Sequence, residues 1–349
     1  MKMILAFSSS SSGVVLTHAN FVHTVKAVFT IITEEVVEAH DHHCWYSFLP
    51  LAHILEFIAE NTIFCAGIKI GYGSPFTMTD LSTGIIKGQP GDLTLLKPTV
   101  IPGVPLVLER IRKTIFEKLS KRSPVLHYLA LWLVDYKTFW LENGYQTPVF
   151  DWLVSTKFRA VFGGNVEYML IGGAQLSPDT QRIMRALLNV QILIVSERKE
   201  DLFMRFDNFN FSSFQGYGST ETCGANMVMD LEDLSIGWTG APLFGIKIRL
   251  VDWPEVGYTH ADKPYPRGEL HVGGQAVSPG YFEQEEQTKE AFYRDEKGVQ
   301  WFRTGDIVEV NAAGLVHIID RRKDLVKMQH GEYISLGKVK NMQRRLFWF

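Results

Sequence analysis

Two periodicities of apolar residues divide the chain. In the first half, apolar positions at helical spacing over residues 18–32 and 52–65 predict helices. Compact apolar or β-rich runs at 44–51, 68–72 and 168–171 predict strands, each bounded by glycine or proline. Strands that alternate with helices are typical of an α/β domain with a largely parallel sheet.

The pattern changes after Gly224. Short apolar runs at 246–251, 268–272 and 315–319 are separated by glycine turns rather than by helical segments. This pattern of short strands predicts a β-rich subdomain, with a distorted barrel as one form that it could take.

The amino-acid composition limits which classes of function this chain can have. Of 349 residues, 46% are apolar, and the net charge of −3 gives no reason to expect a nucleic-acid partner. Three widely spaced cysteines exclude a disulfide framework. The longest apolar run, 125–134, is interrupted by His127 and Tyr128 and is shorter than the ~18 residues of a spanning helix, so the chain is expected to be soluble.

The segment Gly216–Thr222 carries the most specific chemistry. Its glycines allow the backbone to approach a ligand closely, and Tyr217 can stack on a flat ring. Thr220 can donate to a phosphate, and Glu221 offers the carboxylate oxygens that Mg²⁺ prefers. The alternative is a glycine turn with incidental polar residues.

Two further segments lie downstream. Trp301–Asp306 ends in Thr-Gly-Asp, where the acidic residue can accept hydrogen bonds from ribose hydroxyls, although so short a string also arises by chance. Asp320–Lys327 is a charge run, which by itself is usually a solvated face.

In this order and spacing, the three segments resemble the motifs of the adenylate-forming superfamily, which includes acyl-CoA synthetases, luciferases and the adenylation domains of peptide synthetases. The resemblance covers residues 13–193 and 216–339. Four strings are similar to the long-chain fatty acyl branch of that superfamily: Ser47–Glu56, Gly172–Ala174, Arg267–Glu269 and Gly331–Val339.

The resemblance implies an α/β fold, a partial large domain of an adenylate-forming enzyme. Parallel-rich sheets with helices would be joined to the β-rich subdomain. The partial AMP-binding domain would span 13–327, interrupted by an insert at 195–215. Residues 328–349 would begin the small C-terminal domain, with an unrelated tail at 340–349, so that this domain is expected to be essentially missing.

The implied function is ATP-dependent ligation of a long-chain fatty acid to coenzyme A through an acyl-adenylate, with Mg²⁺ as cofactor. The expected partners are therefore the fatty acid, ATP and coenzyme A. The resemblance also implies an address at the cytosolic face of the endoplasmic reticulum, the mitochondrial outer membrane or the peroxisomal membrane. Membrane association of a longer parent protein would use a segment absent from this sequence.

The resemblance assigns roles to matching residues. The nucleotide would be bound by Gly172, Gly173, Ala174, Gly216, Tyr217, Gly218, Thr220, Asp306 and Arg321. Thr220 and Glu221 would meet the phosphates and Mg²⁺ as catalytic residues, and Asp306 with Arg321 would hold the ribose. His53 would lie near the acyl carboxylate, or else be a structural histidine. Lys327 would mark the hinge to the mobile domain.

Departures from the family pattern, together with the essentially missing C-terminal domain, favour an alternative. Ser8–Gly13 stands where the family has a glycine-rich phosphate loop with a lysine, and a serine run is less flexible than glycines and presents its backbone N–H groups to a phosphate poorly. Residues 195–215 match nothing in the family and are interpreted as a retained intron, with a surface loop as the other interpretation. The alternative function is accordingly a non-catalytic truncated isoform or a gene-model fragment that binds nucleotide weakly.

Two cysteine-containing segments carry further candidate chemistry. His40–Cys44 has residues that bind zinc and contains the Asp-His-His-Cys signature of palmitoyl-transferases, but the cysteine-rich surround and the spanning helices of that class are missing. A polar turn before the next strand is the favoured interpretation. Cys223 is expected to be a buried, inert thiol.

Overall fold

The computed structural model describes residues 2–7, 13–35, 42–103 except 81 and 87, 123–143, 147–171, 212–228, 238–327 and 333–335, with scattered positions elsewhere between 109 and 187. The chain divides into two compact units. The first contains Met1–Ala27, Gly218–Val228 and Trp238–Phe349, and the second contains Val28–Tyr217 and Met229–Gly237. Helix α1 (His18–Glu35) passes from one unit into the other.

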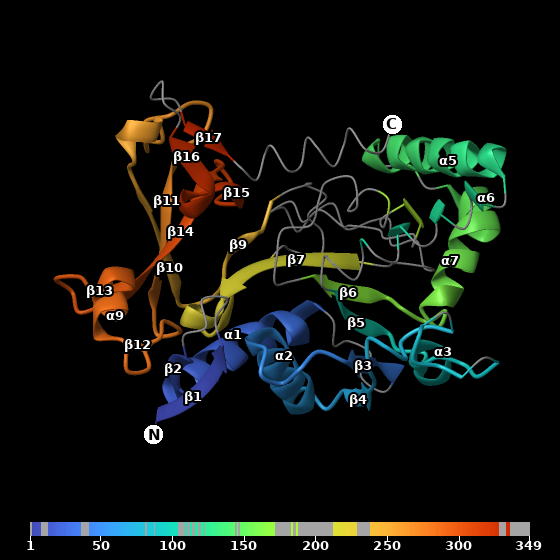
Figure 1. Cartoon of the computed structure of the whole chain (residues 1–349), viewed down its shortest axis with the longest axis horizontal. Coiled ribbons are helices and arrows are strands. Elements are labelled where there is room, and N and C mark those ends of the chain that lie inside the picture. Colours follow the sequence, from blue (N-terminus) through green and yellow to red (C-terminus); the bar gives the residue numbers. More distant parts are fainter. Residues whose placement is uncertain are drawn as a thin grey trace. The chain divides into compact units, whose positions relative to one another are not determined.

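The second unit contains a parallel sheet in the order β4-β3-β5-β6-β7 (Figure 1). Its strands are β3 (Cys44–Ser47), β4 (Lys69–Tyr72), β5 (Val100–Gly103), β6 (Tyr168–Ile171) and β7 (Ser212–Ser219, in this unit up to Tyr217). Its helices are α2 (Ile54–Cys65), α3 (Asp92–Leu96), α5 (Pro124–Glu142), α6 (Pro148–Phe150), a π-helical turn (Asp151–Ser155) and α7 (Thr156–Val161). The predicted parallel α/β arrangement is confirmed.

Side chains cover this sheet on both faces. Trp45 packs with Ala59 and Ile63 of α2, whereas its neighbour Tyr46 packs with Leu93 of α3 on the other face. Successive residues of a strand point to opposite faces, so β3 needs large apolar residues at both positions. This double burial explains why the strand appears in the sequence as a continuous apolar run.

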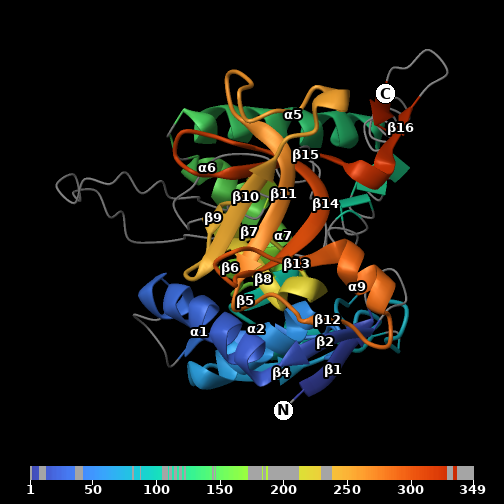
Figure 2. The same ribbon diagram turned by 90° about the vertical axis from the view of Figure 1, so that its left-hand side faces the viewer.

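The first unit is antiparallel. Its largest sheet has the order β10-β11-β14-β13, and β15 pairs with the far part of the long strand β14 (Figure 2). These strands are β10 (Ile246–Val251), β11 (Arg267–Gly274), β13 (Phe292–Arg294), β14 (Gln300–Val310) and β15 (Val316–Arg321). The predicted β-rich subdomain is confirmed, but its described strands form an open sheet rather than a barrel.

Smaller elements complete the first unit. β1 (Lys2–Phe7), β2 (Gly13–Thr17) and β12 (Gly280–Tyr281) form a three-stranded antiparallel sheet, with the short helix α9 (Glu285–Ala291) after it in the chain. β8 (Gly224–Val228) pairs with β9 (Ala241–Pro242), and β16 (Leu325–Lys327) pairs with β17 (Tyr333–Ser335). Short 3-10 turns occupy Thr220–Thr222, Pro254–Val256 and Arg322–Asp324.

The sequence predicted β6 with its observed bounds and placed most other elements within a few residues. The strand expected over 44–51 ends at Ser47, and the helix expected from 52 begins at Ile54 after the Pro50 turn. Within the described part of the chain, no helix has both the length and the apolar character needed to cross a bilayer. The apolar run at 125–134 lies inside α5.

Candidate nucleotide site

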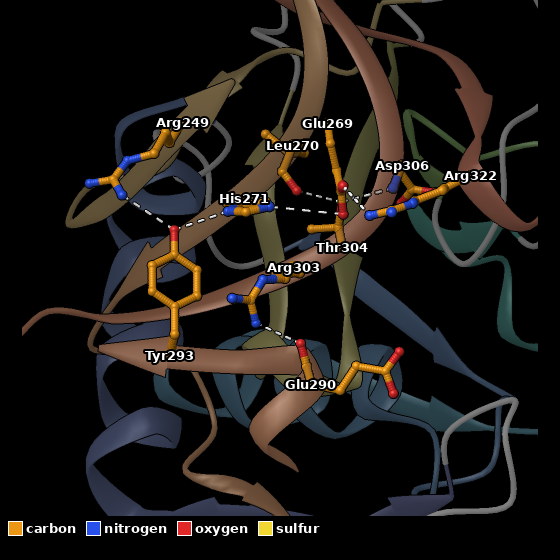
Figure 3. A network of polar contacts seen from close by, with 10 residues as sticks. All are labelled: Arg249, Glu269, Leu270, His271, Glu290, Tyr293, Arg303, Thr304, Asp306 and Arg322. Atoms are coloured by element: carbon orange, nitrogen blue, oxygen red, sulfur yellow. Dashed lines mark hydrogen bonds and ion pairs between the residues drawn. The ribbon is translucent and has the colours of Figure 1, made fainter. Parts of the chain in front are cut away.

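The Thr-Gly-Asp string forms a tight, hydrogen-bonded bend within β14. The Thr304 hydroxyl donates to the Leu270 carbonyl at 2.7 Å and accepts from the Asp306 N–H at 3.0 Å (Figure 3). Gly305 adopts φ +71°, a left-handed conformation in which a side chain would be strained. Threonine and glycine are therefore needed locally, and together they fix the backbone that carries the Asp306 carboxylate.

Asp306 meets Arg321 from the neighbouring strand. The two residues are direct partners in the pairing of β14 with β15, and Arg321 Nε donates to Asp306 Oδ1 at 2.7 Å. Asp306 is 4% exposed, whereas the Arg321 side chain is largely exposed. A carboxylate that receives a guanidinium N–H on one oxygen keeps further lone pairs that can accept hydrogen bonds from hydroxyl groups. The structure thus brings together the two residues to which the resemblance assigned the ribose.

Glu221 lies in the 3-10 turn Thr220–Thr222, which Ser219 and Thr222 close by reciprocal hydrogen bonds. Its carboxylate is buried, and Tyr281 of β12 donates its hydroxyl to Oε1 at 3.1 Å. Burial, followed by the negative charge of Glu221, raises the pKa of Tyr281, so the phenol remains a donor. Tyr281 belongs to this site, although 60 residues separate it from Glu221 and no motif marked it.

The residues around Glu221 suit a hard cation such as Mg²⁺. A carboxylate and the neighbouring Thr220 hydroxyl are oxygen donors, the ligand type that Mg²⁺ selects beside phosphates. Tyr281 orients one carboxylate oxygen, as outer groups commonly do around metal ligands. The donor set therefore fits the cation that the resemblance implies.

Gly218 is required by close packing inside the motif. A Cβ at this position would lie 1.7 Å from the carbonyl oxygen of Gly224, which is backbone and cannot rotate away. The preceding Tyr217 is buried at 9% exposure. Sterics within the turn thus explain the glycine at position 218 without reference to a ligand.

Comparison with known proteins identifies the family. The profile described as AMP-binding enzyme matches residues 11–282, more than half of the chain. The chain belongs to the AMP-binding enzyme family. It is 40% identical to long chain acyl-CoA synthetase 8 of Arabidopsis thaliana over 349 residues, and 35% identical to long-chain-fatty-acid–CoA ligase 1 of Schizosaccharomyces pombe over 336 residues.

The match covers 96% and 95% of this chain but only 45% and 44% of those relatives. The chain therefore spans about half the length of the curated relatives it matches. Solved structures agree on the fold. O-succinylbenzoate coenzyme A synthetase from Bacillus subtilis, in complex with ATP and magnesium ion, gives a TM-score of 0.60 at 21% identity over 97% of this chain and 53% of its own.

A second solved structure is the A domain of carboxylic acid reductase from Segniliparus rugosus, in complex with AMP and a co-purified carboxylic acid. It gives a TM-score of 0.64 at 24% identity over 96% of this chain and 44% of its own. Both likenesses confirm that the AMP-binding chain has the fold of an adenylate-forming domain.

In this AMP-binding enzyme, His53 has a structural role. Its Nδ1 accepts a hydrogen bond from the Leu55 N–H at 3.2 Å, which caps the N-terminus of α2. Partial desolvation lowers the pKa of the imidazole, which favours the neutral ring that a cap acceptor needs. The structure thus shows His53 as a structural histidine, whereas a location of His53 near an acyl carboxylate stays a prediction.

Other predicted site residues of the AMP-binding chain are placed only in part. Gly172, Gly173 and Ala174 lie outside the described residues, immediately after β6. Lys327 is the last residue of β16, which pairs with β17 across the undescribed residues 328–332. Their assigned roles therefore stay predictions.

Cys223 follows the Glu221 turn in a left-handed conformation, with φ +58°. Burial raises the pKa of its thiol to about 11, so at neutral pH the sulfur is protonated and a poor nucleophile. The expectation of a buried, inert thiol is confirmed.

The sequence missed a charged network next to the Asp306–Arg321 pair. Arg322 Nη1 donates to the buried Glu269 at 3.0 Å, and Glu269 lies 3.8 Å from His271 Nε2 (Figure 3). His271 Nδ1 is 2.9 Å from the Tyr293 hydroxyl. The Arg-Gly-Glu string that contains Glu269 was noted as a mark of the long-chain branch, but its partner lies 53 residues away. This ion pair ties β11 to the segment that leads toward Lys327.

Proposed function

We propose that the chain is part of a long-chain fatty acyl-CoA synthetase, which activates a fatty acid with ATP and transfers it to coenzyme A. The observation that carries the proposal is the buried Asp306 carboxylate held by Arg321, two residues that the family motifs assigned to one ribose. The similarity to long-chain acyl-CoA synthetases supports the substrate class.

In this proposal, Asp306 accepts hydrogen bonds from the ribose hydroxyls, and the Arg321 N–H orients the carboxylate. Tyr217, with the glycines around it, lies along the adenine. Mg²⁺ supplies positive charge beside the phosphates. Glu221, oriented by Tyr281, offers it an oxygen ligand, and the Thr220 hydroxyl donates to phosphate. The proposal extends to coenzyme A as co-substrate, and to a membrane address on the cytosolic face of the endoplasmic reticulum, mitochondrion or peroxisome.

Nucleotide binding provides the first test. Calorimetric titration with AMP is expected to detect binding that Asp306→Asn weakens about tenfold or more, because a charge-assisted hydrogen bond is lost. Asp252→Asn is the matched control, since Asp252 is exposed and pairs only with His260 among the contacts of the described chain. Equal affinity in both variants would remove Asp306 from the site.

A second candidate function is nucleotide binding without catalysis. It is favoured by Ser8–Gly13, which lacks the lysine of the family's phosphate loop. ATP–pyrophosphate exchange with palmitate separates the two functions. We expect little or no exchange from these 349 residues, even where AMP binds. Brisk exchange would show that the loop lysine is dispensable and would establish the catalytic function for this chain itself.

A further inference from the structure

We propose a zinc site, formed by His42, His43 and Glu167, at the edge of the parallel sheet where its strands begin. The ligand atoms of these three residues all lie within 4.8 Å of one another. Two imidazoles and one carboxylate form a ligand set that zinc accepts, with a fourth position left for water. The site is independent of the proposed ligase function.

The distances between ligand atoms favour tetrahedral coordination. His42 Nε2 lies 3.4 Å from each carboxylate oxygen of Glu167, and His43 Nδ1 lies 3.7 Å from Oε2. Ligands about 2.0–2.1 Å from a tetrahedral ion are roughly 3.4 Å apart, whereas the corresponding octahedral spacing is roughly 3.0 Å. The spacings from Glu167 to the two histidines are therefore closer to those around zinc than to those around magnesium.

The fold holds two of the ligands in place. The His43 side chain is 2% exposed and lies edge-on against the Tyr168 ring, at 5.9 Å between centroids. The Glu167 N–H donates to the Thr99 carbonyl at 2.8 Å, which fixes the backbone just before β6. The exposed His42 is the adjustable ligand, and the open side of the site admits an ion from solvent.

Binding would require only a small rearrangement of hydrogen bonds. The Thr99 hydroxyl lies 3.2 Å from His43 Nδ1, and 3.4 Å from the Cys44 carbonyl to which it can also donate. When Nδ1 binds a metal, the hydroxyl can rotate toward that carbonyl while it still accepts from the Cys44 N–H at 2.8 Å. The Thr99 hydroxyl therefore keeps both a donor and an acceptor contact after this change.

The structure alters the ligand set that the sequence suggested. Cys44 belongs to the zinc alternative of the sequence, but its Sγ contacts the Trp45 carbonyl at 3.9 Å and is not among the clustered ligand atoms. Glu167 takes its place, although it lies 125 residues after His42. Because β3 and β6 flank β5 in one parallel sheet, their first residues come together at the same edge.

This edge is the end of the parallel sheet opposite to the carboxyl end of β6, which Gly172 follows in the chain. In open α/β sheets, ligands of the active site bind at the carboxyl ends of the strands, and the three metal-binding residues lie at the amino ends. We infer that the ion would join β3 to β6 structurally, so that binding raises the unfolding temperature of the chain.

The test uses the full chain after chelator treatment, titrated with Zn²⁺ by calorimetry and with Co²⁺ by visible absorption. We expect one equivalent to bind, with the intense visible bands of tetrahedral Co²⁺ and a rise of a few degrees in the unfolding midpoint on adding Zn²⁺. His42→Ala and Glu167→Gln should each weaken binding at least about tenfold and abolish the tetrahedral spectrum.

His260→Ala is the matched control, because His260 is also exposed and also lies beside a carboxylate, that of Asp252, at 2.7 Å. It should leave both titrations unchanged. His42 and Glu167 are chosen rather than the buried His43, so that a folding defect does not obscure the result. Absence of binding, a weak octahedral Co²⁺ spectrum, or equal affinity in the His42→Ala and His260→Ala variants would each overturn the proposal.

Discussion

His271 shows how one buried side chain can make stability depend on pH. Desolvation lowers the pKa of its imidazole to about 4, and the positive charges of Arg303, Arg249 and Arg322 act in the same direction. Glu269, 3.8 Å away, is the only negative group among the contacts described for this ring, and it does not offset them. The ring is therefore neutral and buried in the folded protein at physiological pH.

Acidification is expected to destabilise the fold through His271. Above pH 6.5 the ring is neutral in both the folded and unfolded states, so the full contribution of the buried ring to the free energy of unfolding is present. As the pH falls from 6.5 toward 4, only the unfolded state gains the proton, and stability is lost. Between pH 7.5 and 5 the loss should be about 2 kcal/mol. Urea unfolding of His271→Gln should show a correspondingly smaller loss, and an identical pH profile in the variant would contradict this assignment.

Lys137 is a second residue whose surroundings determine how it contributes to stability. It is fully buried on α5 and forms an ion pair with Asp151, while burial lowers the pKa of its amine. Removing one partner leaves the other charge without compensation, which typically costs about 3–5 kcal/mol.

A double-mutant cycle measures this coupling. Lys137→Met and Asp151→Leu should each destabilise the chain by several kcal/mol, whereas the double variant should regain much of the loss because no charge remains buried. Equilibrium denaturation of the four proteins gives the interaction energy. Strictly additive losses would mean that the pair contributes nothing specific.

At the scale of the element, the glycine turn before Glu221 depends on a close backbone approach. β7 passes into the 3-10 turn and then into β8, and the chain doubles back so tightly that Gly218 faces the Gly224 carbonyl. The turn sets the local backbone of Glu221, and the distant Ser278 N–H and Tyr281 hydroxyl then hold its carbonyl and its carboxylate. The turn is therefore the part of the site that sequence motifs describe best.

Gly218→Ala should disrupt this turn. The added methyl would overlap backbone that cannot move cheaply, and overpacking of this kind costs about 1–3 kcal/mol or more. Gly314→Ala is the control, because its φ of +81° is strained for alanine but nothing lies within 4 Å of its Cβ, so a loss of about 1 kcal/mol is expected. Denaturant unfolding that finds Gly218→Ala no more harmful than the control would show that the turn can relax.

At the scale of the whole molecule, each unit has a core of its own. Leu93 is fully buried between the parallel sheet and its helices in the second unit, and Ile307 is fully buried within the antiparallel sheet of the first. Separate cores allow separate local unfolding.

Hydrogen exchange should reveal this division. Leu93→Ala removes buried methyl groups at a cost of about 2–5 kcal/mol, and it is expected to lower amide protection in β3, β5 and β6 while β10, β11 and β14 keep theirs. Ile307→Ala should give the reverse pattern. A uniform loss of protection throughout the chain in either variant would show that the two units unfold as one.

The sequence by itself determined the local structures. The Thr-Gly-Asp bend, the Glu221 turn and most helix and strand positions depend on residues within a few positions of one another, because hydrogen bonds, glycine conformations and apolar periodicity act over short stretches of chain. Family motifs added the pairing of Asp306 with Arg321, which the strand register then placed at 2.7 Å.

Only the tertiary structure decided which distant segments meet. Tyr281 reaches Glu221, Arg322 reaches Glu269, and Glu167 reaches His42, each across more than 50 residues. Strand order and register set these contacts, and no local pattern encodes them, because any of several sheets could bury the same apolar runs. For the same reason the predicted polar turn at His42 and His43 gained a carboxylate neighbour that only the folded sheet supplies.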